Sequence, residues 1–250
     1  MPQHLPPRDT VSARPAATLE WAAKGTEAFE AAVHWLTDSG LTMPSYLPGW
    51  SRAHVVAHVA RNADALVNLL TWARTGVETL MYASGDQRAR EIEEGARRPT
   101  EELRADLLAA DGRLAGELAA LPDECWETTV RTARGREVPV SQVPWMRVRE
   151  VWVHTVDLNI TTFDDVPHEV CAALVDDVAA AFRARPDCPP VELRIKGDVR
   201  TWTLGAPGGA EPVVVSGDVP SLAAYATGRP VPGPLYPVGG ESPPKLPAWL

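Results

Sequence analysis

Apolar residues recur near a 3.6-residue period through the first two-thirds of the chain, a pattern typical of helices that bury one face. Breaker residues such as Gly40, Gly76 and Pro122 separate the periodic segments, Ser51 is placed to cap the second and Thr100 opens the third. The predicted helices cover residues 18–39, 51–75, 100–122 and a segment that begins near 144. Four helices with few strands between them predict an antiparallel bundle.

The last third of the chain changes character. A predicted helix over 167–185 is followed by three short runs rich in Val, Ile, Thr and Trp, and then by a short helix. The runs are residues 191–196, 200–204 and 212–216, and the short helix is 221–227. The link 122–143 is expected to hold a small hairpin. The predicted fold class is α+β, with an N-terminal antiparallel four-helix bundle followed by a small α+β domain.

Proline-rich segments mark both ends. Residues 1–16 carry four prolines and no apolar period, which predicts a flexible tail. Seven of the 24 prolines fall between Pro230 and Pro247, which predicts an extended segment over 231–250. The domains expected between them are a helical domain over 17–164 and the α+β domain over 165–230.

Composition and charge narrow the classes of partner. Apolar residues at 45% and charged residues at 23% are the balance of a soluble globular protein, and a net charge of −9 disfavours nucleic acid or an anionic membrane as partner. The sequence has neither an apolar run long enough for a membrane span nor the apolar core of a signal peptide. Three widely spaced cysteines fit a reducing compartment. We therefore expect a cytoplasmic protein.

Candidate chemistry begins on the second predicted helix. At 100° per residue, its apolar residues form one arc, which His58 and Asn62 flank. His54 lies one turn earlier and is rotated toward the polar side. His58 is therefore the histidine better aimed at the bundle interior.

The fourth predicted helix is apolar around most of its circumference, yet Arg147, Glu150, His154 and Asp157 share one arc. Buried ionised groups are unfavourable unless they are paired or bind a metal. Glu150 and His154, one turn apart, together with His58 would make a two-histidine, one-carboxylate set with an open fourth position, the arrangement of catalytic zinc. The alternative is a structural ion network in which Arg147 and Arg149 neutralise Glu150.

Other polar residues could serve this metal set. Asp157 or Asn62, each one turn from a histidine ligand, could orient it. His54 or Asp157 could instead complete a closed site with four protein ligands. A closed site would indicate a non-enzymatic metal-binding module.

Two segments resemble the mycothiol-dependent maleylpyruvate isomerase family of DinB-like metalloenzymes. They are GWSRAHVVAHVARNADAL at residues 49–66 and REVWVHTVDL at 149–158. The resemblance implies a DinB-like fold for the helical domain and zinc binding by His58, Glu150 and His154. It also implies mycothiol as a thiol cofactor, with Asn62 and Asp64 as signature positions that could contact it.

The same resemblance implies a reaction. Family members convert the cis double bond of maleylpyruvate to the trans bond of fumarylpyruvate, a dicarboxylate substrate that needs cationic recognition. Arg229 resembles an active-site arginine of the family, with Arg61, Arg147 and Arg200 as alternatives. A mycothiol S-transferase acting on another electrophile is the main competing function.

Overall fold

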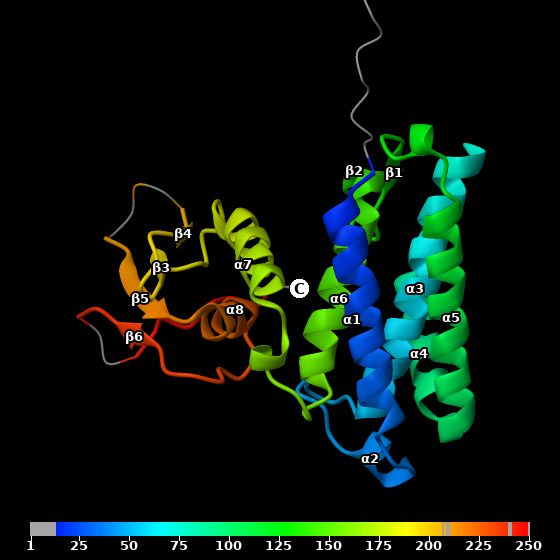
Figure 1. Cartoon of the computed structure of the whole chain (residues 1–250), viewed down its shortest axis with the longest axis horizontal. Coiled ribbons are helices and arrows are strands. Elements are labelled where there is room, and N and C mark those ends of the chain that lie inside the picture. The colour runs from blue at the N-terminus through cyan, green and yellow to red at the C-terminus, as the bar shows by residue number, and fades with distance from the viewer. Residues whose placement is uncertain (1–13, 207, 209–210, 240–241, 250) are drawn as a thin grey trace, which may run out of the picture. The chain divides into compact units, whose positions relative to one another are not determined.

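A computed structural model describes residues 14–206, 208, 211–239 and 242–249. The chain divides into two compact units, the first comprising Met1–Glu27 and Val56–Val148 and the second Ala28–Val55 and Arg149–Leu250. The helices are α1 (Ala16–His34), α2 (Asp38–Thr42), α3 (Arg52–Thr75), α4 (Gly85–Ala96), α5 (Thr100–Ala120), α6 (Val143–Asp157), α7 (His168–Phe182) and α8 (Val219–Thr227), with 3₁₀ turns η1 (Asp123–Cys125), η2 (Val140–Gln142) and η3 (Phe163–Asp165) (Figure 1). The strands are β1 (Thr129–Arg131), β2 (Glu137–Pro139), β3 (Val191–Ile195), β4 (Thr201–Leu204), β5 (Val213–Gly217) and β6 (Tyr236–Pro237).

The first predicted helix is divided in the structure. α1 ends at His34, and α2 begins at Asp38 with Thr37 as its cap, whose hydroxyl accepts a hydrogen bond from the backbone N–H of Gly40 (3.1 Å). A threonine at this position favours a new helix start over continuation of the old one. The α+β class is confirmed.

Ion pairs show that α3 and α5 run in the same direction within the first unit. Arg61 pairs with Asp106 (2.8 Å) early in both helices, and Arg74 pairs with Glu117 (3.5 Å) late in both. The connecting segment 76–99 contains α4, which returns the chain before α5 begins (Figure 1). The predicted helical bundle is present, but this pair is parallel rather than antiparallel, because the connection is long enough to cross back.

The sequence pattern does not predict α4. The helix is capped by Ser84, whose hydroxyl accepts from the N–H of Gln87 (3.0 Å), and it buries only Ile92 and Gly95. A Cβ at position 95 would lie 2.8 Å from the Cβ of Ala57, so glycine allows α4 to approach α3 closely. One buried apolar side chain in three turns gives no period to detect.

Two small sheets complete the units. β1 and β2 form the expected hairpin in the first unit, with Val130 opposite Val138. In the second unit the strand order is β4-β3-β5-β6, where β3 is antiparallel to β4 and parallel to β5. Leu193 lies between Trp202 and Val215 in register, and all three are buried. Helices α7 and α8 contact one another, and α7 contacts β4.

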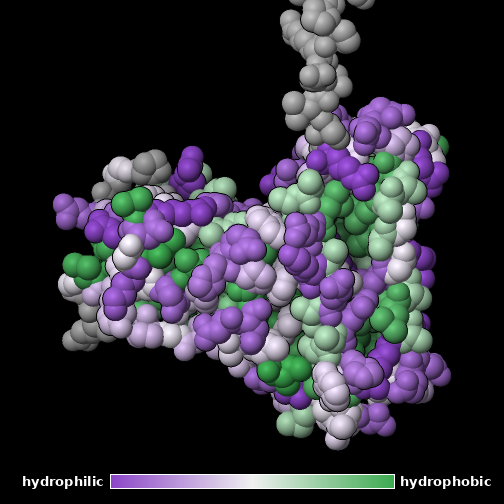
Figure 2. Space-filling view, in the orientation of Figure 1, coloured by the Kyte–Doolittle hydropathy of each residue, from purple (hydrophilic) through white to green (hydrophobic). Residues whose placement is uncertain are grey.

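Each unit has an apolar interior. Leu66, Leu107 and Trp126 are fully buried in the first, and Leu174 and Phe182 in the second. Figure 2 shows hydrophilic side chains over most of the visible face, interrupted by separate hydrophobic patches. Among the described helices, none has the length and apolarity that a membrane span requires.

The predicted domain boundaries at 16/17, 164/165 and 230/231 stay predictions. Most of the predicted N-terminal tail, residues 1–13, lies outside the described residues. In the predicted proline-rich extension, Tyr236 and Pro237 pair with β5, and Trp249 is buried. Part of this segment is therefore an edge strand.

Candidate metal centre

His58 lies on the buried face of α3. Its exposure is 5%, and its neighbours Val56 and Val59 are fully buried. His54 is half-buried, and its Nδ1 lies 2.7 Å from the hydroxyl of Ser51. The helical wheel and the structure therefore both favour His58 as the inward-facing histidine.

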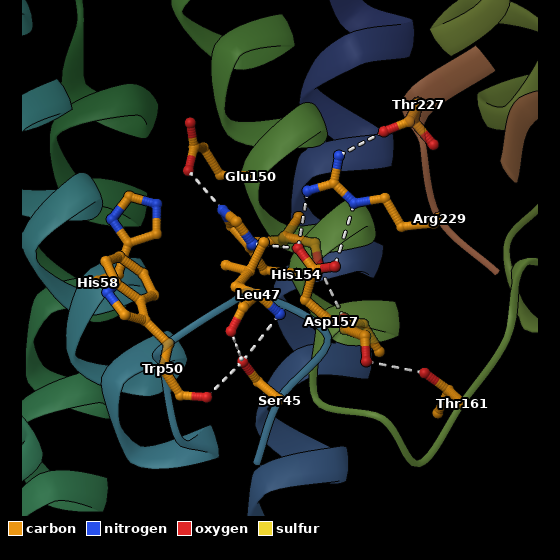
Figure 3. A network of polar contacts seen from close by, with 12 residues as sticks. Ser45, Leu47, Trp50, His58, Glu150, His154, Asp157, Thr161, Thr227 and Arg229 are labelled. Atoms are coloured by element: carbon orange, nitrogen blue, oxygen red, sulfur yellow. Dashed lines mark hydrogen bonds and ion pairs between the residues drawn. The ribbon is translucent and has the colours of Figure 1, made fainter. Parts of the chain in front are cut away.

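Glu150 and His154 lie one turn apart on α6, so their side chains share a face. Oε2 of Glu150 lies 3.3 Å from Nε2 of His154, and Oδ2 of Asp157 lies 2.8 Å from Nδ1 of the same ring. Figure 3 shows the imidazole between these two acidic side chains. Both ring nitrogens of His154 therefore face a carboxylate.

Arg229 contacts the other side of Asp157. Its Nε and Nη2 donate to the two carboxylate oxygens at 3.1 and 2.9 Å, and its Nη1 donates to the carbonyl of Thr227 at 2.7 Å (Figure 3). Asp157 is fully buried. Gly228 ends α8 in the left-handed conformation (φ 75°), and Arg229 follows it directly. The end of α8 therefore places a guanidinium on the carboxylate that contacts His154.

These contacts shift the pKa values of His154 and Asp157. Burial by itself would lower the pKa of His154, but the carboxylates of Asp157 and Glu150 outweigh it and raise the pKa to about 9. Burial would raise the pKa of Asp157, but hydrogen bonds from His154 and Arg229 hold it below its usual value. In the metal-free protein at neutral pH, His154 is therefore a cation between two carboxylates.

His58, Glu150 and His154 each offer one ligand atom, and these atoms lie within 4.8 Å of one another. Two ligands of a tetrahedral zinc ion, each about 2.1 Å from it, are about 3.4 Å apart. The 3.3 Å between Glu150 and His154 fits this spacing. Two imidazoles and a carboxylate suit zinc and other divalent transition ions. A cation would replace the proton on Nε2 of His154, so these residues fit a divalent metal.

Arg147 does not pair with Glu150, the partner that the sequence left open for it. It is 1% exposed, and it donates to the carbonyl of Val59 (2.8 Å) and to Oδ1 of Asn62 (2.9 Å). It also forms an ion pair with the buried carboxylate of Asp111. This buried cluster joins α3, α5 and α6 in the first unit. The charge of Arg147 is therefore balanced by Asp111 rather than by Glu150.

The remaining sequence candidates lie in ion pairs nearer the surface. Asp64 pairs with Arg61 (2.9 Å) and Arg113 (2.5 Å), and its side chain is 34% exposed. Other pairs among the described residues are Arg149 with Asp177 (2.9 Å) and Arg200 with Asp176 (2.7 Å). Arg61, Arg149 and Arg200 therefore all have carboxylate partners.

Sequence reasoning missed Arg88. This residue lies on α4, and its Nη2 is 3.1 Å from Nδ1 of His58. Because α4 carries no apolar period, nothing in the pattern placed it beside α3. The cap at Ser84 and the charged residues that follow were the only local signs of a helix.

The sequence of this chain matches the model of a known protein family. A family model described as the mycothiol maleylpyruvate isomerase N-terminal domain matches residues 22–159, more than half of the chain. The chain belongs to the mycothiol maleylpyruvate isomerase family.

Solved structures agree with this assignment to the maleylpyruvate isomerase family. The crystal structure of the mycothiol-dependent maleylpyruvate isomerase is 34% identical, with a TM-score of 0.88 over 94% of this chain and 96% of that chain. A variant of that isomerase in which alanine replaces one histidine is 33% identical, with a TM-score of 0.87 and the same coverage. The resemblance therefore extends over both units.

A more distant structure shows the fold alone. YfiT from Bacillus subtilis, which has an unusual four-helix bundle topology, is 18% identical, with a TM-score of 0.50 over 62% of this chain and 90% of that chain. A search of curated proteins gave no match. The DinB-like fold predicted for this isomerase-family chain is confirmed.

Proposed function

We propose that this protein is a zinc- and mycothiol-dependent isomerase that converts maleylpyruvate to fumarylpyruvate, with His58, Glu150 and His154 as the metal ligands. The observation that carries the proposal is the convergence of their three ligand atoms within 4.8 Å, in a chain of the maleylpyruvate isomerase family. Three protein ligands among the described residues leave one metal position for a thiol.

A zinc ion held here would lower the pKa of a thiol bound to it, so that thiolate forms near neutral pH. The proposed conversion proceeds by thiolate addition to the cis double bond, rotation about the resulting single bond, and elimination to the trans isomer. The thiol is released unchanged, so the conversion needs no oxidant or reductant.

The chain's own residues prepare His154 for this role. Asp157 accepts the hydrogen bond from Nδ1, which leaves Nε2 as the ligand atom and fixes the ring orientation. We propose that Arg229, predicted to act in catalysis, contributes through Asp157, because each of its guanidinium nitrogens donates to a protein oxygen. In this role Arg229 is a positioning residue.

The two residues predicted to contact mycothiol have different surroundings. Asp64 has an accessible carboxylate that could bind a polyhydroxylated cofactor, and we keep it as a hypothesis for mycothiol binding. Asn62 is 3% exposed and accepts a hydrogen bond from Arg147. We propose that Asn62 supports the packing of α3 one turn after His58.

The test is to incubate the zinc-loaded protein with maleylpyruvate, with and without mycothiol, and to follow both product and free thiol. We expect fumarylpyruvate to form only with mycothiol, while the thiol concentration stays constant. Stoichiometric thiol loss with a thioether product would indicate an S-transferase instead. His58→Ala should lose metal and activity together, and full zinc content in this variant would contradict the ligand assignment.

Two further expectations stay predictions. They are a cytoplasmic location, and a small electrophilic substrate with a low-molecular-weight thiol as partners rather than nucleic acid or a membrane.

A further inference from the structure

Arg88 lies beside a proposed metal ligand without being one itself. Its Nη2 is 3.1 Å from Nδ1 of His58, and its guanidinium carbon lies 5.5 Å from the ring centroid of Tyr82. The side chain is half-buried, and all three residues belong to the first unit. This places a cation next to the predicted reaction site.

Arg88 differs in its partners from other arginines of the first unit. In the described part of the chain, no carboxylate forms an ion pair with Arg88, whereas Arg61, Arg98 and Arg113 in the same unit each pair with an aspartate. The partners of Arg88 are an imidazole nitrogen and an aromatic face. Among the described contacts of this guanidinium only Nη2 donates a hydrogen bond, so Nε and Nη1 remain as donors for an added carboxylate.

The hydrogen bond between Arg88 and His58 also competes with a metal. A guanidinium can only donate, so Nδ1 of His58 accepts this hydrogen bond. A neutral imidazole has one in-plane lone pair, and a metal ion needs that lone pair. A metal ion held by Nδ1 would compete with Arg88 for that lone pair.

We propose that Arg88 binds a carboxylate of the substrate beside His58. The identity of the substrate rests on the proposed function, which supplies a dicarboxylate. The recognition itself applies to any small dicarboxylate. Arg229, engaged with Asp157, then positions a ligand, and Arg88 contacts the substrate.

The first experiment measures binding without turnover. Succinate, a saturated dicarboxylate that cannot accept a thiol, is titrated calorimetrically into the zinc-loaded protein without mycothiol. We expect Arg88→Met to weaken succinate binding by about tenfold or more, as for loss of a charge-assisted bidentate contact. Arg90→Met, which alters an exposed arginine on the same helix, should leave it unchanged. Equal succinate affinity in Arg88→Met, or no succinate binding by the unaltered protein, would overturn the inference.

The second experiment measures zinc affinity of the metal-free protein. Arg88→Met should bind zinc about three- to tenfold more tightly, because both the competing hydrogen bond and a nearby positive charge are gone. Weaker zinc binding would show that Arg88 supports His58 and would overturn the inference. Because neither experiment uses maleylpyruvate, a failure of the proposed isomerase activity remains distinguishable from a failure of this assignment.

Discussion

Oδ2 of Asp157 lies 2.8 Å from Nδ1 of His154, and both residues come from the same helix. Asp157 is fully buried and carries a guanidinium on its other side, so this carboxylate stays ionised and holds the imidazole in one orientation. Asp157 thus links the predicted metal ligand His154 to Arg229, which lies 72 residues after Asp157 in the chain.

Replacing Asp157 by Asn should weaken zinc binding by about 10- to 100-fold, because the amide no longer provides a charged acceptor for Nδ1 of His154. A competitive zinc titration of the metal-free protein gives this value. Asp187→Asn, which alters an exposed carboxylate paired with Arg185, serves as the matched control and should bind zinc normally. Unchanged zinc affinity in Asp157→Asn would remove Asp157 from the metal centre.

Arg229→Met distinguishes a positioning role from direct substrate contact. If Arg229 acts through Asp157, we expect zinc affinity to fall and kcat to fall with it. Arg229→Lys should recover only part of the loss, because an ammonium cannot donate to both carboxylate oxygens in a fixed fork. Normal zinc affinity combined with a raised KM would show instead that Arg229 binds the substrate.

The pH dependence of zinc binding follows from the proton on His154. Because its pKa is raised to about 9, zinc must displace a proton at neutral pH, so the apparent zinc affinity should rise by about tenfold per pH unit between pH 7 and 9. Calorimetry in buffers of different ionisation enthalpy would count the released proton. A zinc affinity that is flat with pH over this range would contradict a protonated His154.

The metal-free fold should respond to pH in the opposite direction. A histidine whose folded pKa is raised contributes stability that is fully present below its unfolded pKa of about 6.5 and is lost as pH rises through about 9. We expect the free energy of unfolding of the metal-free protein to fall by a few kcal/mol at most across this window. In Asp157→Asn the fall should be smaller, as measured by urea unfolding at pH 6.5 and 9.5.

The buried pair of Arg147 and Asp111 should matter for stability rather than for substrate. Arg147→Met alone should destabilise the fold by about 3–5 kcal/mol, because it leaves Asp111 charged in the core. The double variant with Asp111→Leu should recover much of this loss. The surface pair of Asp64 and Arg113 is the control, where Arg113→Ala should cost less than about 1 kcal/mol. Urea unfolding of the single and double variants tests both expectations.

The local sequence pattern by itself determines much of the fold. The period of the apolar residues located α3, α5, α6 and α7, and the Val- and Thr-rich runs located β3, β4 and β5, because burial of one face leaves a regular trace in the sequence. The charged arc on an otherwise apolar helix indicated Glu150 and His154 for the same reason. A buried charge is costly, so it stands out.

Other features depended on contacts between residues far apart in the chain. The parallel course of α3 and α5 follows from the long connection through α4, a helix held by the close approach of Gly95 to Ala57 rather than by an apolar stripe. The partners of the charged residues could not be predicted from the sequence either. Arg147 pairs with Asp111, Arg229 with Asp157, and Arg88 with His58. A helical period determines which face a side chain lies on, whereas its partner is chosen by the element packed against that face, and only the tertiary structure determines which element that is.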